Sequence, residues 1–555
     1  MERLRDIFTL NFDEQDPLMF TQLDFWLFFL AVMVIFSFIH KHYLARSFFL
    51  TFISLFFYFK TSGLYVLLLG LSLVVNFGLG KSVYKAKADL SKKWLIAASV
   101  IFNLLILGYF KYAYFFTDSF NAMFETNYEI VNQFALWGNQ LFENASFVEE
   151  ILLPVGVSFF TFQSISYVVD IYRNDVKPVK NFFDYSFFVT YFPQLVAGPI
   201  VRAKDFIPQI RQPYSLNKTD FSGAIIQIVK GLIKKLVLAD YIAVHFIDKI
   251  ADSPEAYPGF VSVLAMWGYS LQIYGDFSGY TDIAIGLSRL MGFKIKENFN
   301  SPYKAINVAD FWRRWHRSLG SWLKDYLYIP LGGNRTGGIG TYIAITIIFI
   351  FLIFITQWYE LLFVYTGLTA IYLIGVLMIP NFKLYVHRDL NLIITMVVGG
   401  LWHGASENFV LWGAMNGIAL VIYKYWSKIS FYEKSTWLIT HFWKIFITFN
   451  FITFTRIWFR LEEDGQPALM LNQIWNHFDF TWDVFIKVLI TYQSVFWIML
   501  VGYILHWLPD KIKNIWERAF TKLPLILQTL AVAIIIIIVY QAAAGTSKPF
   551  VYFQF

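Results

Sequence analysis

The chain has 555 residues, of which 57% are hydrophobic and only 15% are charged, and its mean hydropathy is +0.53. Soluble domains average about 45–50% apolar and about 25% charged residues, so an ordinary soluble protein is excluded. Disordered, collagen-like and disulfide-stabilised classes are excluded by the same balance and by the absence of cysteine. The remaining class is a polytopic membrane protein built from α-helices.

The net charge is modest, at +7, and the basic residues stand in short loops between apolar runs. This pattern follows the positive-inside rule of membrane proteins and does not form a nucleic-acid-binding face. We expect a lipid bilayer, and no nucleic acid, as the surroundings of this chain.

A helix needs about 20 apolar residues to cross a bilayer, and some of the apolar runs in this chain are shorter or contain Pro and Gly, notably 183–201 and 391–402. Non-helical backbone at membrane depth is tolerated only inside protein or beside a water-filled cavity. We therefore expect about 11 transmembrane helices plus re-entrant segments, in one membrane domain over 1–555. The candidate runs are 22–39, 47–59, 64–79, 94–116, 151–172, 183–201, 224–248, 260–275, 340–358, 360–380, 391–402, 408–426, 437–459, 486–508 and 525–545.

Charged loops predict the orientation. Residues 80–93 and 202–218 are basic, which predicts a cytoplasmic position, whereas 117–150 carries acidic residues and no Lys or Arg, which predicts an external one. The N-terminal 20 residues are too acidic for a cleavable signal peptide. We expect a multi-pass protein of the bacterial inner membrane, with both termini in the periplasm.

A first polar island covers 272–335, and within it 309–328 is predicted to be a basic aromatic helix. One interpretation is an interfacial helix anchored at the lipid headgroups by Trp and Arg. The other is a cytoplasmic site for an anionic carrier such as a nucleotide-phosphate thioester. The candidate donor-binding cations are Arg313, Arg314, Arg317 and Lys324, and Asp276, Asp282 and Asp310 are expected to pair with them.

A second island covers 396–416, where His403 follows Gly399 and Gly400 in an apolar setting. A lone histidine in such a segment is commonly a hydrogen-bonded packing residue. The small neighbours leave space around this imidazole, however, and Trp402 and Trp412 are placed to form the walls of a pocket. An imidazole there can take a proton from a hydroxyl group, so packing and catalysis are both open interpretations.

Several common motifs are missing from the sequence. It has no H-E-x-x-H or similar metal-ligand spacing, so we expect no metal site. It also has no G-x-S-x-G elbow and no Walker loop, which disfavours an α/β-hydrolase and a nucleotide-driven pump.

These segments resemble the membrane-bound O-acyltransferase family, in its bacterial alginate O-acetylation branch. The resemblance covers nearly the whole chain, and its motifs are long and specific. They are LPVGVSFFTFQSISYVVDIYR (153–173), YFPQLVAGPI (191–200), QIYGDFSGYTDIAIGLSRLMGF (272–293), ENFNSPY (297–303), FWRRWHRSL (311–319), DYLYIPLGGNR (325–335), LWHGASENFVLWGAMNG (401–417) and PFVYFQF (549–555).

The resemblance implies a multi-helix fold around a tunnel through the membrane. The family's essential histidine falls on His403, in the W-H-G motif, and a second polar position falls on His316, in R-W-H-R-S-L. It further implies that an acyl donor reaches the histidine from the cytoplasm and an acceptor reaches it from outside. The expected donor is acetyl-CoA or another acyl thioester, with no permanently bound cofactor. The expected acceptor is a hydroxyl of an exported polysaccharide or of a periplasmic partner acetyltransferase.

The expected reaction has His403 as the general base on the attacking hydroxyl, and His316 positioning a reactant or stabilising the oxyanion. A covalent relay through an acylated His403 is the alternative. Many relatives have Trp where this chain has Glu407. If this segment is helical, Glu407 shares a face with His403 and either bonds to its imidazole or lines the external mouth.

A different class of function, a secondary transporter with a proton-coupled His403, also explains polar residues and broken helices at membrane depth. It predicts inverted repeats, which the sequence does not contain, and it leaves the motifs of the resemblance unexplained.

Overall fold

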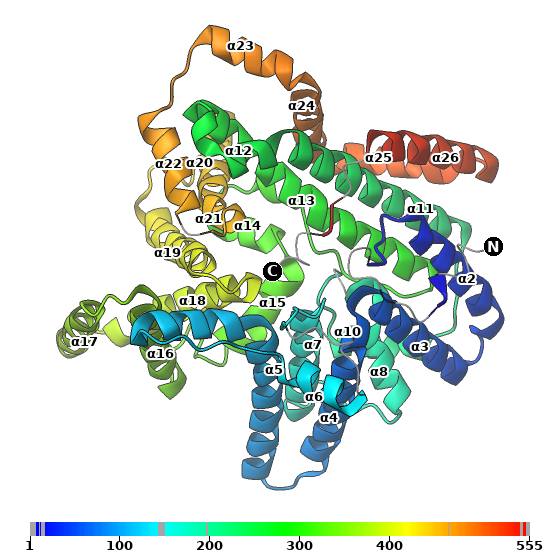
Figure 1. Ribbon diagram of the computed structural model, residues 1–555, viewed down its shortest axis with the longest axis horizontal. Coiled ribbons are helices and arrows are strands. Elements are labelled where there is room, and N and C mark those ends of the chain that lie inside the picture. The colour runs from blue at the N-terminus through cyan, green and yellow to red at the C-terminus, as the bar shows by residue number, and fades with distance from the viewer. Residues whose placement is uncertain are drawn as a thin grey trace.

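The computed structural model describes residues 7–9, 12, 17–142, 150–195, 198–463, 465–543 and 548–550. Within these ranges the regular structure is helical and no strand occurs, which confirms the predicted all-α class. Figure 1 shows the long helix α13 (Gly259–Leu290) passing through the middle of the molecule, with pairs of helices projecting around it.

The N-terminal part is joined by an aromatic core. The Phe57 ring packs at a tilt against that of Phe192, with centroids 5.5 Å apart, and the Phe25 ring lies 5.8 Å from Phe57. Lipid offers no hydrophobic driving force between helices, so such close packing carries much of their association. The helices are α2 (Leu23–Ile39), α3 (Tyr43–Ser62), η1 (Gly63–Tyr65), α4 (Val66–Lys85), α5 (Asp89–Phe124), α6 (Gln133–Phe142), α7 (Val157–Tyr172), α8 (Phe182–Thr190), α9 (Phe192–Leu195) and α10 (Ala203–Ile210).

The middle of the chain corrects one expectation. The predicted single helix over 309–328 is wrong, because α14 ends at Arg314, a break follows at Trp315 and His316, and α15 begins at Arg317. The elements here are α11 (Lys218–Leu232), the π-helical η2 (Ile233–Asp240) and η3 (Ala243–Ile247), α12 (Asp248–Asp252), η4 (Pro254–Ala256), α13, η5 (Pro302–Lys304), α14 (Val308–Arg314), α15 (Arg317–Leu323) and the π-helical η6 (Lys324–Tyr328).

Two helical pairs follow. Helices α16 (Ile339–Thr356) and α17 (Leu361–Met378) project at one edge of the molecule (Figure 1) and expose most of their apolar side chains, as helices in contact with lipid do. Helices α18 (Phe382–His403) and α19 (Glu407–Ile429) pack closely against one another. The run 391–402, expected to be short or broken, is the second half of the continuous α18.

Glycine permits the close packing of α18 and α19. A Cβ atom on Gly413 would lie 2.5 Å from the carbonyl oxygen of Met396, and one on Gly400 would collide with the carbonyl oxygen of Phe409. The absence of side chains at these two positions lets the backbones meet, which is the usual role of small residues between membrane helices. The contact fixes the helix that carries His403.

The C-terminal part of the chain packs around the central helix α13. Residues 548–550 return to it, and Phe550 is buried against Phe277 and Tyr280 of α13, at ring distances of 5.6 and 4.4 Å. The rest of the motif at 549–555 lies outside the described residues. The helices are α20 (Leu438–Thr455), α21 (Ile457–Arg460), α22 (Gln466–Asn476), α23 (Trp482–Thr491), α24 (Gln493–Trp507), α25 (Asp510–Lys522) and α26 (Leu525–Ala542).

Five helical segments of the described chain are long and apolar enough to cross a membrane, and α23 with α24, bent by 86°, gives a sixth if the pair is one span. The five are Tyr43–Lys85, Asp89–Phe124, Ile339–Thr356, Leu361–Met378 and Leu525–Ala542. Helix α18 does not belong to this set, and its first turns carry Lys383, Arg388 and Asp389. The membrane character is thus supported by several helices, and the number of about 11 spans stays a prediction.

Candidate active site

His403 is the last residue of α18 and is buried, with 2% of its surface exposed. Aromatic rings surround its imidazole: Trp402 at 5.0 Å, Trp412 of α19 at 5.2 Å and Phe459 of α21 at 5.2 Å. The two tryptophans therefore form walls around His403, as the sequence analysis expected. The imidazole is thus packed against aromatic rings on several sides.

His316 occupies the break between α14 and α15, where its backbone has φ = +41°. A non-glycine residue in the left-handed region is uncommon, and such strain clusters at functional sites. The side chain is 1% exposed, and its ring lies 4.6 Å from Phe277 and 5.9 Å from Trp402. Trp402 thus contacts both histidines, which the sequence separates by 87 positions (403 minus 316).

Asn298 fixes the tautomer of His316. Its Oδ1 accepts hydrogen bonds from the backbone N–H and the hydroxyl of Ser318, at 3.0 and 2.9 Å. A backbone N–H only donates, so this atom of Asn298 is the oxygen, and His316 Nδ1, 3.2 Å away, must donate to it. In the neutral ring the other nitrogen, Nε2, then carries the lone pair.

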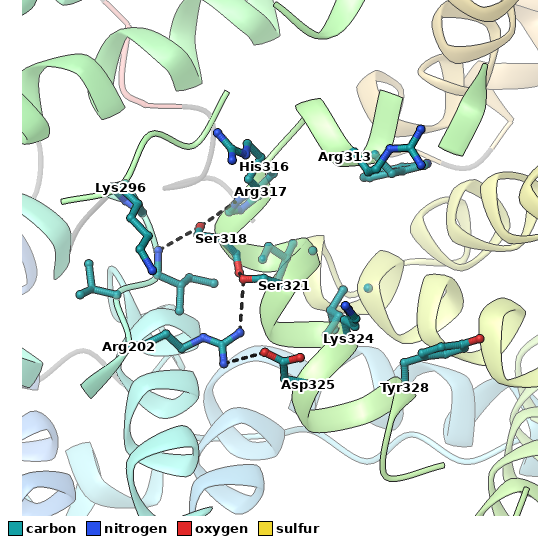
Figure 2. A pocket seen from close by; sticks show the side chains of 18 of the residues that line it. Arg202, Lys296, Arg313, His316, Arg317, Ser318, Ser321, Lys324, Asp325 and Tyr328 are labelled. Carbon is teal, nitrogen blue, oxygen red and sulfur yellow. Dashed lines mark hydrogen bonds and ion pairs between the residues drawn. The ribbon is translucent and has the colours of Figure 1, made fainter. Parts of the chain in front are cut away.

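Both histidines line one cavity of about 1120 Å³. Figure 2 shows part of its wall, where Arg317 lies next to His316, with Lys296 and Arg202 to one side and Arg313 and Lys324 to the other. Three of the four predicted donor-binding cations, Arg313, Arg317 and Lys324, line this cavity. Within the described chain, Arg317 and Lys324 have no carboxylate within 4 Å, so their charges are available to an anion there.

The fourth predicted cation, Arg314, is not among the residues that line this cavity. Its Nε donates to Asp310 Oδ2 at 2.9 Å, and Arg313 lies 3.6 Å from the other oxygen of Asp310. The predicted pairing of Asp310 with the basic stretch is therefore confirmed.

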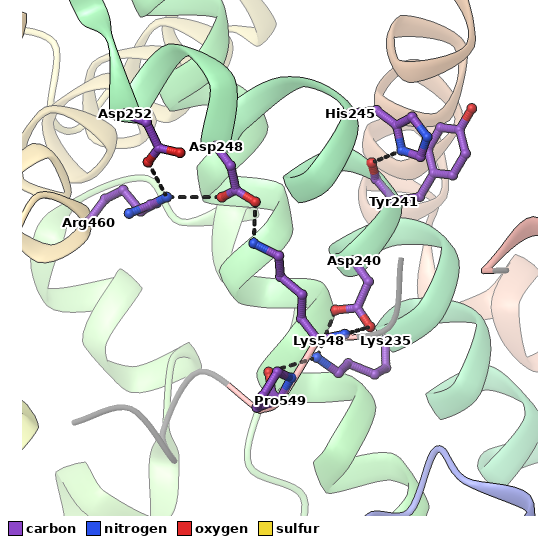
Figure 3. A network of polar contacts seen from close by, with 9 residues as sticks. All are labelled: Lys235, Asp240, Tyr241, His245, Asp248, Asp252, Arg460, Lys548 and Pro549. Carbon is purple, nitrogen blue, oxygen red and sulfur yellow. Dashed lines mark hydrogen bonds and ion pairs between the residues drawn. The ribbon is translucent and has the colours of Figure 1, made fainter. Parts of the chain in front are cut away.

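The predicted pairing of Asp276 and Asp282 with that stretch is wrong. Asp276 accepts from Lys235 Nζ at 2.6 Å, and Asp282 accepts from Lys234 Nζ at 2.6 Å. Both lysines belong to η2, which lies beside α13. Lys235 Nζ also donates hydrogen bonds to Asp240, at 2.7 Å, and to the carbonyl oxygen of Pro549, at 3.2 Å (Figure 3). The second bond holds residues 548–550 in the core.

Two small cavities also reach His403. One, of about 20 Å³, is lined by residues 153–159, Lys111 and Trp402. The other, of about 10 Å³, is lined by Trp315, Phe459 and Arg456. Arg456 is 3% exposed, lies 4.8 Å above the Trp315 ring and donates to the Tyr303 hydroxyl at 2.7 Å.

Four residues of this region escaped the sequence analysis: Lys111, Arg202, Asn298 and Arg456. Lys111 and Arg456 interrupt apolar runs, and an ionisable residue at such a position is a functional candidate by default. Arg202, 7% exposed, bonds to Tyr326, Ser321 and Asp325 and braces the cavity wall (Figure 2). Asn298 stands in the ENFNSPY motif and carries no signal of its contact with His316.

Glu407 does not share a helical face with His403, because α18 ends at His403 and α19 begins at Glu407. Its side chain is exposed. Across the residues that the structure describes, no group of three or more His, Asp or Glu side chains is arranged to hold a metal ion.

Comparison with known proteins places these features in a family. Residues 179–369 match the profile described as MBOAT, membrane-bound O-acyltransferase family, a range that includes His316 and ends before His403. The chain is 32% identical over 435 residues to the peptidoglycan O-acetyltransferase of Helicobacter pylori, covering 74% of this chain and 70% of that protein.

Two further relatives match a shorter part of the chain. The chain is 36% identical over 356 residues to the probable alginate O-acetylase of Pseudomonas putida, covering 62% of this chain and 59% of that protein. It is 26% identical over 309 residues to the teichoic acid D-alanyltransferase of Bacillus subtilis, covering 54% of this chain and 67% of that protein. The chain thus spans between 45% and 59% of the length of the probable alginate O-acetylases that it matches.

Proposed function

The chain belongs to the membrane-bound O-acyltransferase family, and on that premise we propose that it moves an acetyl group from a cytoplasmic thioester to a hydroxyl group outside the cytoplasm. The observation that carries the proposal is the cavity of about 1120 Å³, which joins a cationic wall to the buried His403. Its volume slightly exceeds the roughly 300–1,000 Å³ found for small-molecule sites. That space suits a nucleotide-sized donor.

The donor is expected to bind by its phosphates. Arg317 and Lys324 present charges to the cavity, and Arg313 lines it farther along (Figure 2). Guanidinium and ammonium groups bind phosphate oxygens through charge-assisted hydrogen bonds. The acyl end of the molecule would then extend past His316 toward His403. Acetyl-CoA or another acyl thioester meets these requirements, and no permanently bound cofactor is required.

The chemistry follows from the two imidazoles. His403 takes the proton of the acceptor hydroxyl while the oxygen of that hydroxyl attacks the thioester carbonyl, and a tetrahedral intermediate forms. The C–S bond then breaks, and the departing sulfur takes the proton from His403. His316, with Nδ1–H held by Asn298, offers the lone pair of Nε2 and so positions a group that donates a hydrogen bond. A relay through acyl-His403 is the alternative route to the same products.

The acceptor is a hydroxyl of an exported polysaccharide or of a periplasmic partner acetyltransferase. The relatives named above act, by their names, on alginate, on peptidoglycan and on teichoic acid. Two of these names specify O-acetyl transfer, and both belong to relatives with higher identity than the D-alanyltransferase, which favours acetyl here. The protein would lie in the inner membrane with both termini in the periplasm.

The test uses the full chain purified in detergent with radiolabelled acetyl-CoA. Wild type is expected to release and transfer label, whereas folded His403→Ala and His316→Ala variants lose that turnover. Loss of a general base costs typically 10²–10⁴-fold in rate. Equal turnover in wild type and both variants would refute the assignment, and a folded wild type without turnover would favour a proton-coupled transporter.

A further inference from the structure

The last turn of α18 is held by another helix. The last carbonyl groups of an α-helix have no partner within the helix, and α18 ends at His403 with extended backbone at Gly404. Lys111 Nζ donates to the carbonyl oxygens of Trp402, at 2.6 Å, and of His403, at 3.1 Å. The Tyr112 hydroxyl donates to the carbonyl oxygen of Leu401 at 2.6 Å. Two neighbouring residues of α5 thus satisfy three consecutive carbonyls.

The ammonium group of Lys111 faces the carbonyl end of α18. Lys111 lies in Asp89–Phe124, a helix apolar enough to span a membrane, where an ammonium group is costly. Within the described residues no carboxylate lies within 4 Å of it. The C-terminal end of a helix carries about half a negative charge, which a cation at that end offsets. The carbonyls of α18 are therefore the groups in direct contact with this charge, while the carboxylate of Glu462 interacts with it electrostatically without a direct ion pair, and Lys111 is oriented toward His403 as a result.

The contact with α19 holds one side of this turn, at Gly400, but the end of the helix has no glycine cap of its own. Helix α18 lacks a glycine in the left-handed conformation at its end, the common C-terminal cap of helices, since Gly404 has φ = −159°. Fraying of the last turn would rotate the backbone of His403 and displace its imidazole from the cavity. Lys111 also lines the cavity of about 20 Å³ that reaches His403 from the side of residues 153–159.

We propose that Lys111 is the positioning residue of this active site: its ammonium group caps α18 from α5 and fixes the imidazole of His403 for acyl transfer. This inference rests on the proposed function. A displacement of about 1 Å can cost about 10²-fold in rate, so the contribution is expected in kcat rather than in donor binding.

The experiment compares Lys111→Met, which keeps the length of the side chain and removes its charge, with Lys111→Arg and with Lys93→Met. Lys93 lies on the same helix but at its exposed end, paired with Asp89 at 2.7 Å. Turnover of radiolabelled acetyl-CoA by the full chain in detergent gives kcat and KM. We expect Lys111→Met to lower kcat by about 10- to 100-fold with KM within twofold, Lys111→Arg to recover most of it, and Lys93→Met to match wild type.

Hydrogen exchange supplies a readout that does not depend on activity. Fraying exposes the amide hydrogens of 400–403, so their exchange is expected to be faster in Lys111→Met and unchanged in Lys93→Met. If Lys111→Met does not fold, Tyr112→Phe takes its place, because it removes the bond to Leu401 and keeps the charge; it should accelerate the same exchange.

The outcomes separate the two proposals. Unchanged kcat in folded Lys111→Met, or unchanged exchange at 400–403, would overturn the positioning role while leaving acyl transfer intact. A wild type that does not turn over the thioester would instead refute the proposed function. A fall in thermal stability with kcat per folded molecule unchanged would mean that Lys111 has only a structural role, which also contradicts the inference.

Discussion

Asn298 Oδ1 lies 3.2 Å from His316 Nδ1, and the same oxygen accepts two hydrogen bonds from Ser318. The contact links the loop after α13 to the break between α14 and α15, where His316 has its positive φ. It therefore sets both the tautomer of the imidazole and the path of the backbone that carries it.

The first prediction concerns this contact. Asn298→Leu removes the acceptor at similar size, so the orientation and tautomer of His316 are no longer fixed. We expect turnover to fall about 10- to 100-fold, by analogy with the outer-shell hydrogen-bond partners that orient metal-ligating histidines. Ser318→Ala, which keeps the acceptor and its backbone donor, should lose less. A folded Asn298→Leu variant with normal turnover would contradict this role.

Donor binding gives the second prediction. Arg317→Gln and Lys324→Gln each remove a charge from the cavity, and a hydrogen bond to a charged group is worth about 1.5–3 kcal/mol. We expect KM for acetyl-CoA to rise roughly 10-fold or more with kcat little changed, and to depend less on salt. Arg314→Gln is the matched control, because Arg314 contacts Asp310 instead of lining the cavity. An equal rise in KM for Arg314→Gln would argue against phosphate binding at this wall.

The composition predicted the all-α membrane class, which the structure confirms. The motifs singled out His403 and His316, and the structure brings both to one cavity, whereas their roles in catalysis stay a prediction. Sequence order misplaced the partners of Asp276 and Asp282, since the cations nearest in sequence are not the nearest in space once η2 packs on α13. The sequence also predicted one continuous helix through His316, because a residue in the left-handed conformation does not change the spacing of apolar residues along the sequence. Lys111 was visible as a charge in an apolar run, but its contact with residues 291 and 292 positions away was not.

The third prediction tests the contact between α18 and α19. In Gly413→Ala the new methyl group meets the carbonyl oxygen of Met396 at 2.5 Å, so the helices must separate. Overpacking of this kind costs about 1–3 kcal/mol, and the thermal midpoint in detergent should fall together with turnover. Gly78→Ala is the control, because a Cβ atom there meets nothing within 4 Å. Similar midpoints for the two variants would show that the contact is not tight.

The fourth prediction concerns pH. Lys513 of α25 donates to Ser301 Oγ and to the His506 carbonyl, both at 3.0 Å. Burial, and next the charge of Lys304, lower the pKa of Lys513 from 10.5 to about 8. Between about pH 8 and 10.5 the unfolded chain holds a proton that the folded chain has released, so this group makes stability rise with pH there.

Thermal midpoints at about pH 7.5 and about pH 9.5 measure that contribution, because the first pH lies below the pKa of Lys513 in the folded chain and the second lies between its folded and unfolded values. Lys513→Met should lose part of the rise that wild type shows, whereas Lys511→Met, an exposed change on the same helix, should keep it. An identical rise in all three proteins would contradict the pKa assigned to Lys513.

The central claim is that the protein moves an acyl group from a cytoplasmic donor to a hydroxyl on the other side of the membrane, and that this transfer requires His403. Inside-out vesicles from bacterial cells that express the full chain present the cytoplasmic face to added radiolabelled acetyl-CoA. We measure label that becomes esterified in the lumen, protected from esterase added outside. The account predicts that label accumulates with wild type and not with folded His403→Ala. Equal accumulation in both, or none in wild-type vesicles that hydrolyse the donor, would contradict it.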